Sequence, residues 1–308
     1  MSTTCPKPSR VFVLLLLLAG GRLLAQEDAL FQTLEQTWRD ASAAVTTRVP
    51  SAEELARVEA LFVRTLSGER DSGLVVAWRQ FGFRFYAVGE GEIWALRDIR
   101  NFGRGFYLFR PPGALPVLLQ APHAFHDLDT GEIAMRWFVE GPWLAGAWNT
   151  AHRYEVLPDL RPVDWVDRRD QYGQALTAAA LSVMSRGVIV QLHGFEQMNR
   201  VTPAGRDAAV ILSNGRETPS PAVWSLDACF EGFQLGQVRV FGEDVMELGG
   251  TRNQQALAVH ADGGRLWFLH LEMDRPLRRN LVRDRSLRDD LAGCLLDRRL
   301  CGYPPRSR

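Results

Sequence analysis

After Pro116 the sequence alternates short apolar runs with longer amphipathic stretches, and this pattern constrains the possible folds more than any other feature of the chain. The runs that predict strands are "VLLQ", "LAGAWN", "GVIVQLHG", "DAAVILSN", "QVRVFG", "QALAVHA" and "RLWFLHLEM". The stretches that predict helices span residues 131–141, 168–186 and 276–293. Strands that alternate with helices favour a mostly parallel sheet with helices on both faces. We therefore expect an α/β domain over residues 113–308, with a doubly wound, mixed but mostly parallel sheet.

A smaller α+β region, residues 26–112, is predicted ahead of this domain. Residues 27–46 and 51–68 repeat apolar side chains at helical spacing, which predicts two amphipathic helices. The β-like runs "GLVVAW", "FRFYAVG", "EIWALRD" and "GFYLFR" follow, separated by glycines and ended by "PPGALP". We expect an antiparallel meander that leads into the main sheet, and its lack of clustered reactive residues favours a role as a scaffold, a lid or a packing unit.

Residues 1–25 have the order of features of a secretory signal peptide. Lys7 and Arg10 precede the apolar run "VFVLLLLLAGG", and "LLA" comes directly before Gln26. We expect cleavage after Ala25 and a periplasmic or secreted protein. No later segment is apolar for long enough to cross a membrane, so no membrane partner is expected after cleavage. Removal of the three basic residues of this segment changes the net charge from 0 to about −3, and no basic patch indicates a nucleic-acid partner.

Three cysteines remain after this cleavage: Cys229, Cys294 and Cys301. An exported chain is exposed to oxidising conditions, which favour disulfide bonds. Cys294 and Cys301, with six residues between them, are predicted to close a small disulfide loop, and Cys229 is predicted to be buried and free. A thiolate zinc site is not expected, because the chain has no CxxC pair.

All six histidines lie after position 120, and two of them end predicted strands. His123 follows "LPVLLQ", and His193 is part of "VIVQLHG". Because parallel strands end at the same edge of a sheet, we expect these imidazoles to lie close together. Two imidazoles and a carboxylate form a ligand set for catalytic zinc, with a fourth position open for water. The sequence therefore predicts a Zn²⁺ site at this edge.

Two residues are candidates for the third ligand of this predicted site. Asp127 is preferred because it lies four residues after His123. His126 is the rival, and it either binds the metal or lines the pocket. Glu132 lies farther along, where a helix is expected to begin, and Asp129 fits a turn or a helix cap in "DTGE". Chance clustering and a solvated loop are the alternatives to a metal site.

Glu272 is the candidate catalytic base. In "RLWFLHLEM" it shares one strand face with His270, because side chains two residues apart point the same way. A carboxylate at the exit of a core strand is costly to bury unless it is paired or functional. We expect Glu272 to take a proton from water at the metal and to pass it to a leaving amine. The alternative is a structural salt bridge with Arg275 or Arg278.

Three segments, "APHAFHDLDTGEIA", "QLHGF" and "LHLEMDRPLRRNL", resemble zinc-dependent carboxypeptidase-like amidohydrolases, especially poly-gamma-glutamate hydrolases and, more distantly, N-formylglutamate amidohydrolases. The resemblance covers residues 116–290 and implies a zinc-carboxypeptidase-like fold with Glu272 as the general base. The zinc ligands that it implies are His123, Asp127 and His193. The spacing His-x-x-x-Asp departs from the His-x-x-Glu of the carboxypeptidases, which leaves the choice between Asp127 and His126 open.

Further polar residues follow predicted strands and are candidates for contact with a substrate. They are Asn149, His152, Arg153 and Arg200. An arginine at such a place can hold a substrate carboxylate with two parallel N–H donors. Asp164 and Asp167 either orient a ligand histidine or cap the next helix.

Together these features predict an exported zinc-dependent hydrolase that cleaves an amide bond, peptide or γ-glutamyl-like, in a small acidic substrate. A secreted binding protein that keeps the hydrolase-like fold without turnover is the alternative from another class. A zinc deformylase or esterase is a third hypothesis. No GxSxG or Walker motif supports serine hydrolase or nucleotide chemistry, and the sequence does not indicate an oligomeric state.

Overall fold

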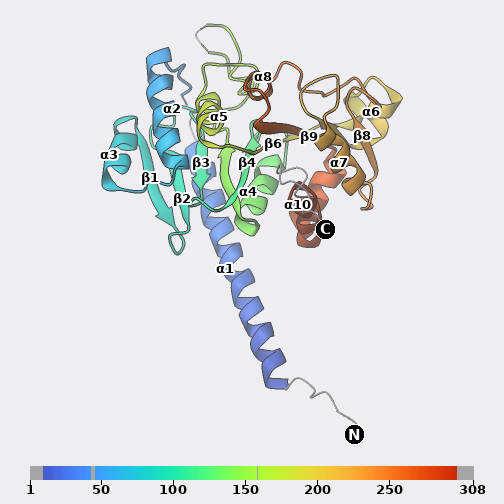
Figure 1. Cartoon of the computed structure of the whole chain (residues 1–308), viewed down its shortest axis with the longest axis horizontal. Coiled ribbons are helices and arrows are strands. Elements are labelled where there is room, and N and C mark those ends of the chain that lie inside the picture. The colour runs from blue at the N-terminus through green and yellow to red at the C-terminus, as the bar shows by residue number, and fades with distance from the viewer. Residues whose placement is uncertain (1–9, 43–45, 158, 297–308) are drawn as a thin grey trace.

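One mixed sheet of nine strands runs through the described part of the chain (Figure 1). The computed structural model describes residues 10–42, 46–157 and 159–296. In chain order the strands are β1 (Phe83–Val88), β2 (Ile93–Asp98), β3 (Phe106–Phe109), β4 (Leu115–Ala121), β5 (Trp143–Trp148), β6 (Gly187–Gly194), β7 (Ala208–Ser213), β8 (Gln237–Val240) and β9 (Leu266–Met273).

Parallel pairing is concentrated in the middle of this sheet, whose strand order is β1-β2-β3-β5-β4-β6-β9-β7-β8. Strands β5, β4, β6 and β9 are parallel to their neighbours in this set. The meander β1-β2-β3 pairs antiparallel with β5 on one side, and β7 pairs antiparallel with β9 on the other. A mixed α/β sheet and the meander are confirmed. Within residues 113–308 the sheet is mostly parallel, as predicted: of the five described pairs among β4–β9, four are parallel and β7–β9 is antiparallel.

Helices cover both faces of the sheet. They are α1 (Arg10–Ser42), α2 (Ala52–Leu66), α3 (Ser72–Gln80), α4 (Thr130–Glu140), α5 (Tyr172–Val183), α6 (Pro203–Asp207), α7 (Pro221–Phe230), α8 (Gln254–Ala261), α9 (Arg275–Arg283) and α10 (Arg285–Leu295), with a 3₁₀ turn at Gln197–Asn199. Helices α2, α3, α5 and α8 share one core with the sheet, around Phe62 and Trp78. Helices α1, α4, α7, α9 and α10 share another, around Trp137 and Phe138.

Helix α1 extends well beyond the sheet in Figure 1, and the predicted cleavage point after Ala25 lies within it. Among the residues that the structure describes, no helix has both the length and the apolar character needed to cross a membrane.

Two runs that predicted strands are helical. "GLVVAW" belongs to α3, whose first turn is capped by the Asp71 carboxylate accepting from the backbone N–H of Leu74. "QALAVHA" belongs to α8, where the Asn253 side chain accepts from two backbone N–H groups. Both runs are short and apolar, and periodicity alone does not distinguish a buried strand from a short buried helix. A capping residue shortly before each run favours the helix.

The predicted C-terminal helix and disulfide also differ from the structure. Two helices, α9 and α10, replace the single predicted helix, and they meet at Asp284. The disulfide joins Cys229 on α7 to Cys294 on α10, across 65 residues, instead of Cys294 to Cys301. Cys301 lies outside the described residues. Packing of α7 against α10 brings together two cysteines that are distant in the sequence.

One face of the parallel strands changes from apolar to polar toward their carboxyl ends. The strand register places Gln120 of β4 beside Gln191 of β6, and Gln191 beside His270 of β9. Two residues further along the same face, His193 pairs with Glu272. The fold therefore gathers polar side chains from three strands on the face that α5 and α8 cover, at the edge where the parallel strands end.

Candidate metal centre

His123 and Asp127 lie in the turn that follows β4. The backbone N–H groups of His126 and Asp127 both donate to the carbonyl oxygen of His123 at 2.8 Å, which forms one helical turn. Residues four apart in such a turn lie on the same side, so the imidazole and the carboxylate face the same space. The Thr130 hydroxyl donates to the Asp127 carbonyl oxygen at 2.7 Å, where α4 begins.

His193, near the end of β6, brings a second imidazole to this place. The Nδ1 atoms of His123 and His193 are 3.1 Å apart. The Oδ2 atom of Asp127 lies 3.3 Å from the first and 3.4 Å from the second. Ligand atoms at about 2.0–2.2 Å from a tetrahedral zinc ion are about 3.3 Å from one another. The three atoms thus have the spacing of three ligands of one ion.

The other nitrogen of each ring has a hydrogen-bond partner. Asp164 Oδ1 lies 2.9 Å from Nε2 of His123, and Gln191 Oε1 lies 3.2 Å from Nε2 of His193. Both oxygens are acceptors, so Nε2 carries the proton and the Nδ1 lone pairs point toward Asp127. Asp164 was a candidate for this orienting role from the sequence. Gln191 was missed, although it precedes His193 by two residues and therefore shares its strand face.

Burial and mutual contact shift the pKa values of these groups. Burial disfavours the Asp127 carboxylate, but its close contacts with the rings of His123 and His193 hold its pKa well below its usual range. Burial also disfavours a charged His123, yet contacts with Asp127 and Asp164 raise the pKa of this ring. Burial lowers the pKa of His193 to about 4. At neutral pH His193 is therefore neutral.

Glu272 is buried beside these three residues. Its Oε2 atom accepts no hydrogen bond, and burial followed by repulsion from Asp127 raises its pKa to about 8. The predicted alternative, a salt bridge with Arg275 or Arg278, is not formed. Both of these arginines instead lie near Glu196, at 3.6 and 3.3 Å.

His270 is a further buried residue of the site that the sequence did not single out. Its ring lies 4.3 Å from that of His193 between centroids, and its Nε2 is 3.9 Å from Glu272 Oε1. Its Nδ1 atom has no hydrogen-bond partner, and burial keeps its pKa well below the usual value. His193, His270 and Glu272 form a second group of potential ligands, which shares His193 with the first.

The two groups line a cavity of about 880 Å³. Two predicted substrate contacts, Arg153 and Arg200, also line it. Arg153 donates to His123 Nδ1 at 2.8 Å and pairs with Asp164 at 2.7 Å. Arg200 lies 3.7 Å from Glu247. The cavity therefore offers guanidinium groups close to the imidazoles and carboxylates.

The remaining predicted residues lie at the rim or outside the cavity. His126 is exposed, and its Nε2 faces the Tyr154 hydroxyl at 3.5 Å, so it does not join the three converging atoms. His152 is exposed and packs against His126 with 5.8 Å between ring centroids. Asn149 is buried and does not line the cavity, contrary to its predicted contact with a substrate. Its amide donates to the Pro122 carbonyl oxygen at 3.0 Å and so supports the turn that carries His123.

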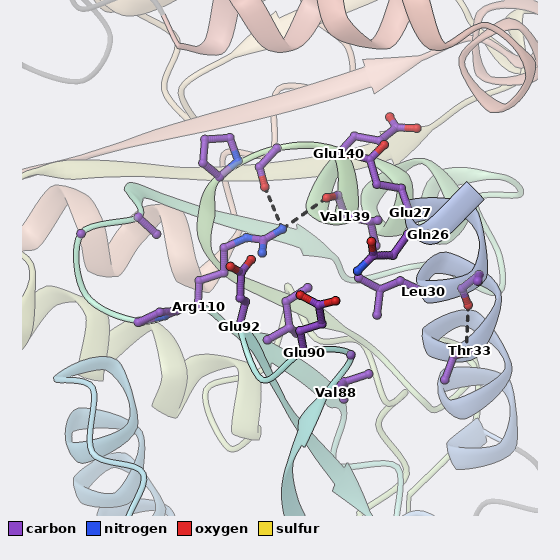
Figure 2. A pocket seen from close by; sticks show the side chains of 18 of the residues that line it. Gln26, Glu27, Leu30, Thr33, Val88, Glu90, Glu92, Arg110, Val139 and Glu140 are labelled. Atoms are coloured by element: carbon purple, nitrogen blue, oxygen red, sulfur yellow. Dashed lines mark hydrogen bonds between the residues drawn. The ribbon is translucent and has the colours of Figure 1, made fainter. Parts of the chain in front are cut away.

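A larger cavity, of about 970 Å³, lies at the opposite end of the parallel strands, between α1, the β1–β2 turn and the residues that precede β4 and β5 (Figure 2). Two of its carboxylates, Glu27 and Glu140, are paired with Arg285 and Arg288. Arg110 donates to backbone carbonyl groups at the end of α4. No histidine or cysteine is among the described residues that line it. Its size therefore does not make it the better candidate for chemistry.

No family model matches the sequence, and no curated protein matches it either. Solved structures to which the chain is similar include three of low sequence identity. One is a candidate metallopeptidase from Shewanella amazonensis SB2B, with 13% identity and a TM-score of 0.38 over 83% of this chain and 99% of that chain. The second is a candidate metallopeptidase from Shewanella denitrificans OS217, with 13% identity and a TM-score of 0.38 over 76% and 92%. The third is a candidate carboxypeptidase from Burkholderia mallei ATCC 23344, with 10% identity and a TM-score of 0.38 over 74% and 67%.

Proposed function

We propose that this chain is an exported zinc-dependent hydrolase that cleaves an amide bond in a small acidic substrate. One observation carries the proposal. The Nδ1 atoms of His123 and His193 and the Oδ2 atom of Asp127 converge within 3.4 Å of one another, beside the buried and unpaired Glu272. Three lone pairs at this spacing repel one another unless a proton or a metal ion lies between them.

The donor set and its charge fit one divalent ion. Two neutral imidazoles with the carboxylates Asp127 and Glu272 carry two negative charges, which one such ion balances. Nitrogen and oxygen donors at tetrahedral spacing suit zinc, and hydrogen bonds to Asp164 and Gln191 orient both rings for it. His123, Asp127 and His193 would hold the ion, and the chemistry that zinc would supply there is polarisation of a substrate carbonyl group and activation of water.

Glu272 is the residue that moves the proton in this proposal. Its Oε2 atom is unpaired in the cavity, so it is free to accept a proton from the attacking water and to deliver it to the leaving nitrogen. Burial raises its pKa to about 8, which keeps the acid form accessible for the second transfer. A nearby cation would favour the carboxylate form needed for the first.

Arg153 and Arg200 both line the cavity, and their positive charges support the proposal that the substrate carries an acidic group. Arg153 donates to the same His123 nitrogen that zinc would need. Metal binding would therefore free this donor for a substrate carboxylate, while the second arm of the guanidinium keeps Asp164 in place.

Two features support export. The first 25 residues have the composition of a signal peptide, and Cys229 and Cys294 form a disulfide, which persists mainly in oxidising compartments.

The test is to purify the chain from residue 26 onward without chelators and to measure its metal content by elemental analysis. We expect about one zinc ion per chain and turnover of γ-glutamyl or C-terminally acidic peptides. Glu272→Gln should lower kcat by about 10²- to 10⁴-fold while zinc stays bound. The exposed Glu243→Gln is the matched control and should leave kcat unchanged.

Three outcomes would contradict parts of this proposal. A zinc content far below one per chain removes the metal centre. Bound zinc without turnover of any amide, formyl or ester substrate favours the binding-protein alternative. Unchanged activity in Glu272→Gln removes Glu272 as the base.

A further inference from the structure

We propose that Gln191 is a positioning residue, whose side-chain oxygen selects the His193 tautomer that can bind a metal ion through Nδ1. The proposal rests on the metal site proposed above, but it does not depend on the reaction at that site. Gln191 is fully buried in the sheet and does not line the cavity, so it acts only through His193.

The orientation of the Gln191 amide is set from one side by Asn253. The Asn253 Oδ1 atom accepts from the backbone N–H groups of Gln255 and Ala256 at 3.0 and 3.2 Å, where α8 begins. Backbone N–H groups are always donors, so the oxygen of Asn253 must face them and its Nδ2 must point away. This Nδ2 donates to Gln191 at 2.6 Å, which requires Gln191 to present its oxygen.

A second backbone group fixes the same amide from the other side. Gln255 Nε2 donates to the carbonyl oxygen of Trp165 at 2.9 Å, so the Gln255 oxygen faces Gln191 at 3.5 Å. The Gln120 oxygen accepts from Gln191 Nε2 at 2.7 Å. Both contacts require Gln191 to place its nitrogen away from His193. Backbone groups at two ends of the network thus give one consistent orientation.

This orientation decides which nitrogen of His193 carries the proton. Gln191 Oε1 lies 3.2 Å from Nε2 of His193, and an amide oxygen only accepts, so the proton resides on Nε2. Asp127 competes for it, because its Oδ2 atom lies 3.4 Å from Nδ1 and would accept a proton from that nitrogen. If the proton lay on Nδ1 and were donated to Asp127, an N–H group would occupy the position where a metal ion needs the Nδ1 lone pair.

The test compares Gln191→Met with Gln120→Met in the same network. Methionine matches glutamine in length but removes its hydrogen bonds, and only Gln191 contacts His193. Two quantities are measured: the zinc dissociation constant, by competition with a chromophoric chelator, and the His193 tautomer in metal-free protein, by long-range ¹H–¹⁵N correlation. Thermal unfolding checks that both variants are folded.

We expect Gln191→Met to weaken zinc binding by about 10- to 100-fold and to move the His193 proton toward Nδ1. Gln120→Met should keep the proton on Nε2 and should weaken binding much less. Gln191→Glu keeps an acceptor at the same place, so His193 should stay protonated on Nε2 in this variant, in contrast to Gln191→Met. Where Gln191→Met does not fold, Asn253→Ser retains a helix cap but removes the donor that fixes the amide, and it should give the same change in smaller measure.

Equal loss of zinc affinity in the two methionine variants, or an unchanged tautomer in Gln191→Met, would overturn the proposal. Failure of the proposed function has a different signature. If the wild-type chain binds no zinc, the metal site is wrong, whereas the tautomer of His193 in metal-free protein still reports whether Gln191 controls it.

Discussion

Glu272 illustrates how a single residue couples stability to function. Its carboxyl group is buried, lacks an ion pair with an arginine among the described residues, and has one oxygen without a partner. A structural role would normally require a partner for such a group. In the proposed function, the unfavourable burial of this acid falls at the position where a metal ion and a substrate would contact it.

This burial predicts a pH-dependent stability in the metal-free protein. The pKa of Glu272 is about 8 in the folded chain, against an ordinary value of 4.5. Between these values the folded chain retains a proton that the unfolded chain has released, so the contribution of Glu272 to stability falls as the pH rises. Glu272→Gln does not titrate. We therefore expect its melting temperature, relative to wild type, to rise by several degrees from pH 5 to pH 8.

The measurement is thermal unfolding by circular dichroism after removal of metal with a chelator. Glu243→Gln is the control, because this glutamate is exposed, and its melting temperature should follow that of wild type at every pH. A difference between Glu272→Gln and wild type that stays constant with pH would show that Glu272 is not a buried acid.

At the scale of elements, the sequence predicted what depends on local pattern and missed what depends on packing. "VIVQLHG" and "RLWFLHLEM" were long, apolar and strand-like, and both form central strands. "GLVVAW" and "QALAVHA" were too short for periodicity to decide, and each became a helix behind a capping Asp71 or Asn253. The strand order β1-β2-β3-β5-β4-β6-β9-β7-β8 was not predicted, because it depends on contacts between distant segments.

The candidate site divides in the same way. His123 and His193 were predicted to lie close together because both are at strand ends. The structure confirms this, since their Nδ1 atoms are 3.1 Å apart. The period of two already places Gln191 on the strand face of His193 and His270 on that of Glu272, but only the register shows that Gln191 and His270 lie side by side on neighbouring strands. Asn149 was predicted to contact a substrate because it is polar and follows a strand. Its side chain instead forms hydrogen bonds with backbone groups of Pro122 and Ala151.

The disulfide between α7 and α10 gives a prediction at this scale. Cys229→Ala and Cys294→Ala should each lower the free energy of unfolding by about 2–4 kcal/mol, because both remove the same cross-link between helices. Cys301→Ala should have a smaller effect. Denaturation with and without reductant measures the difference, and peptide mapping by mass spectrometry identifies the linked cysteines. A Cys294–Cys301 peptide in the oxidised protein would contradict the pairing.

At the scale of the whole molecule, one sheet joins the region of residues 26–112 to the rest of the chain. Strand β3 pairs with β5 along its length, and α2 packs against α5. The Tyr172 hydroxyl donates to Glu54 at 2.6 Å, and its ring lies 5.4 Å from that of Phe83. The two predicted regions therefore share a core and a hydrogen-bonded sheet.

This continuity predicts cooperative unfolding. The chain from residue 26 onward should unfold in a single transition, with coincident curves from tryptophan fluorescence and far-ultraviolet circular dichroism. A fragment that begins at residue 113 should aggregate, because it exposes the edge of β5 and the face of α5 that α2 covers. Two separate transitions in the longer chain would show that the regions fold independently.

The pairing of β9 with β6 has a consequence for how such a protein changes over time. Glu272 stands opposite His193 in this register, and successive side chains of a strand point to opposite faces. Loss or gain of one residue in β9 ahead of Glu272 would turn the carboxyl group into the other core and leave the two imidazoles and Asp127 untouched. In the proposed function, metal binding and proton transfer would thus depend on separate segments of the chain, and one deletion in β9 would remove the base while the three ligand residues stay in place.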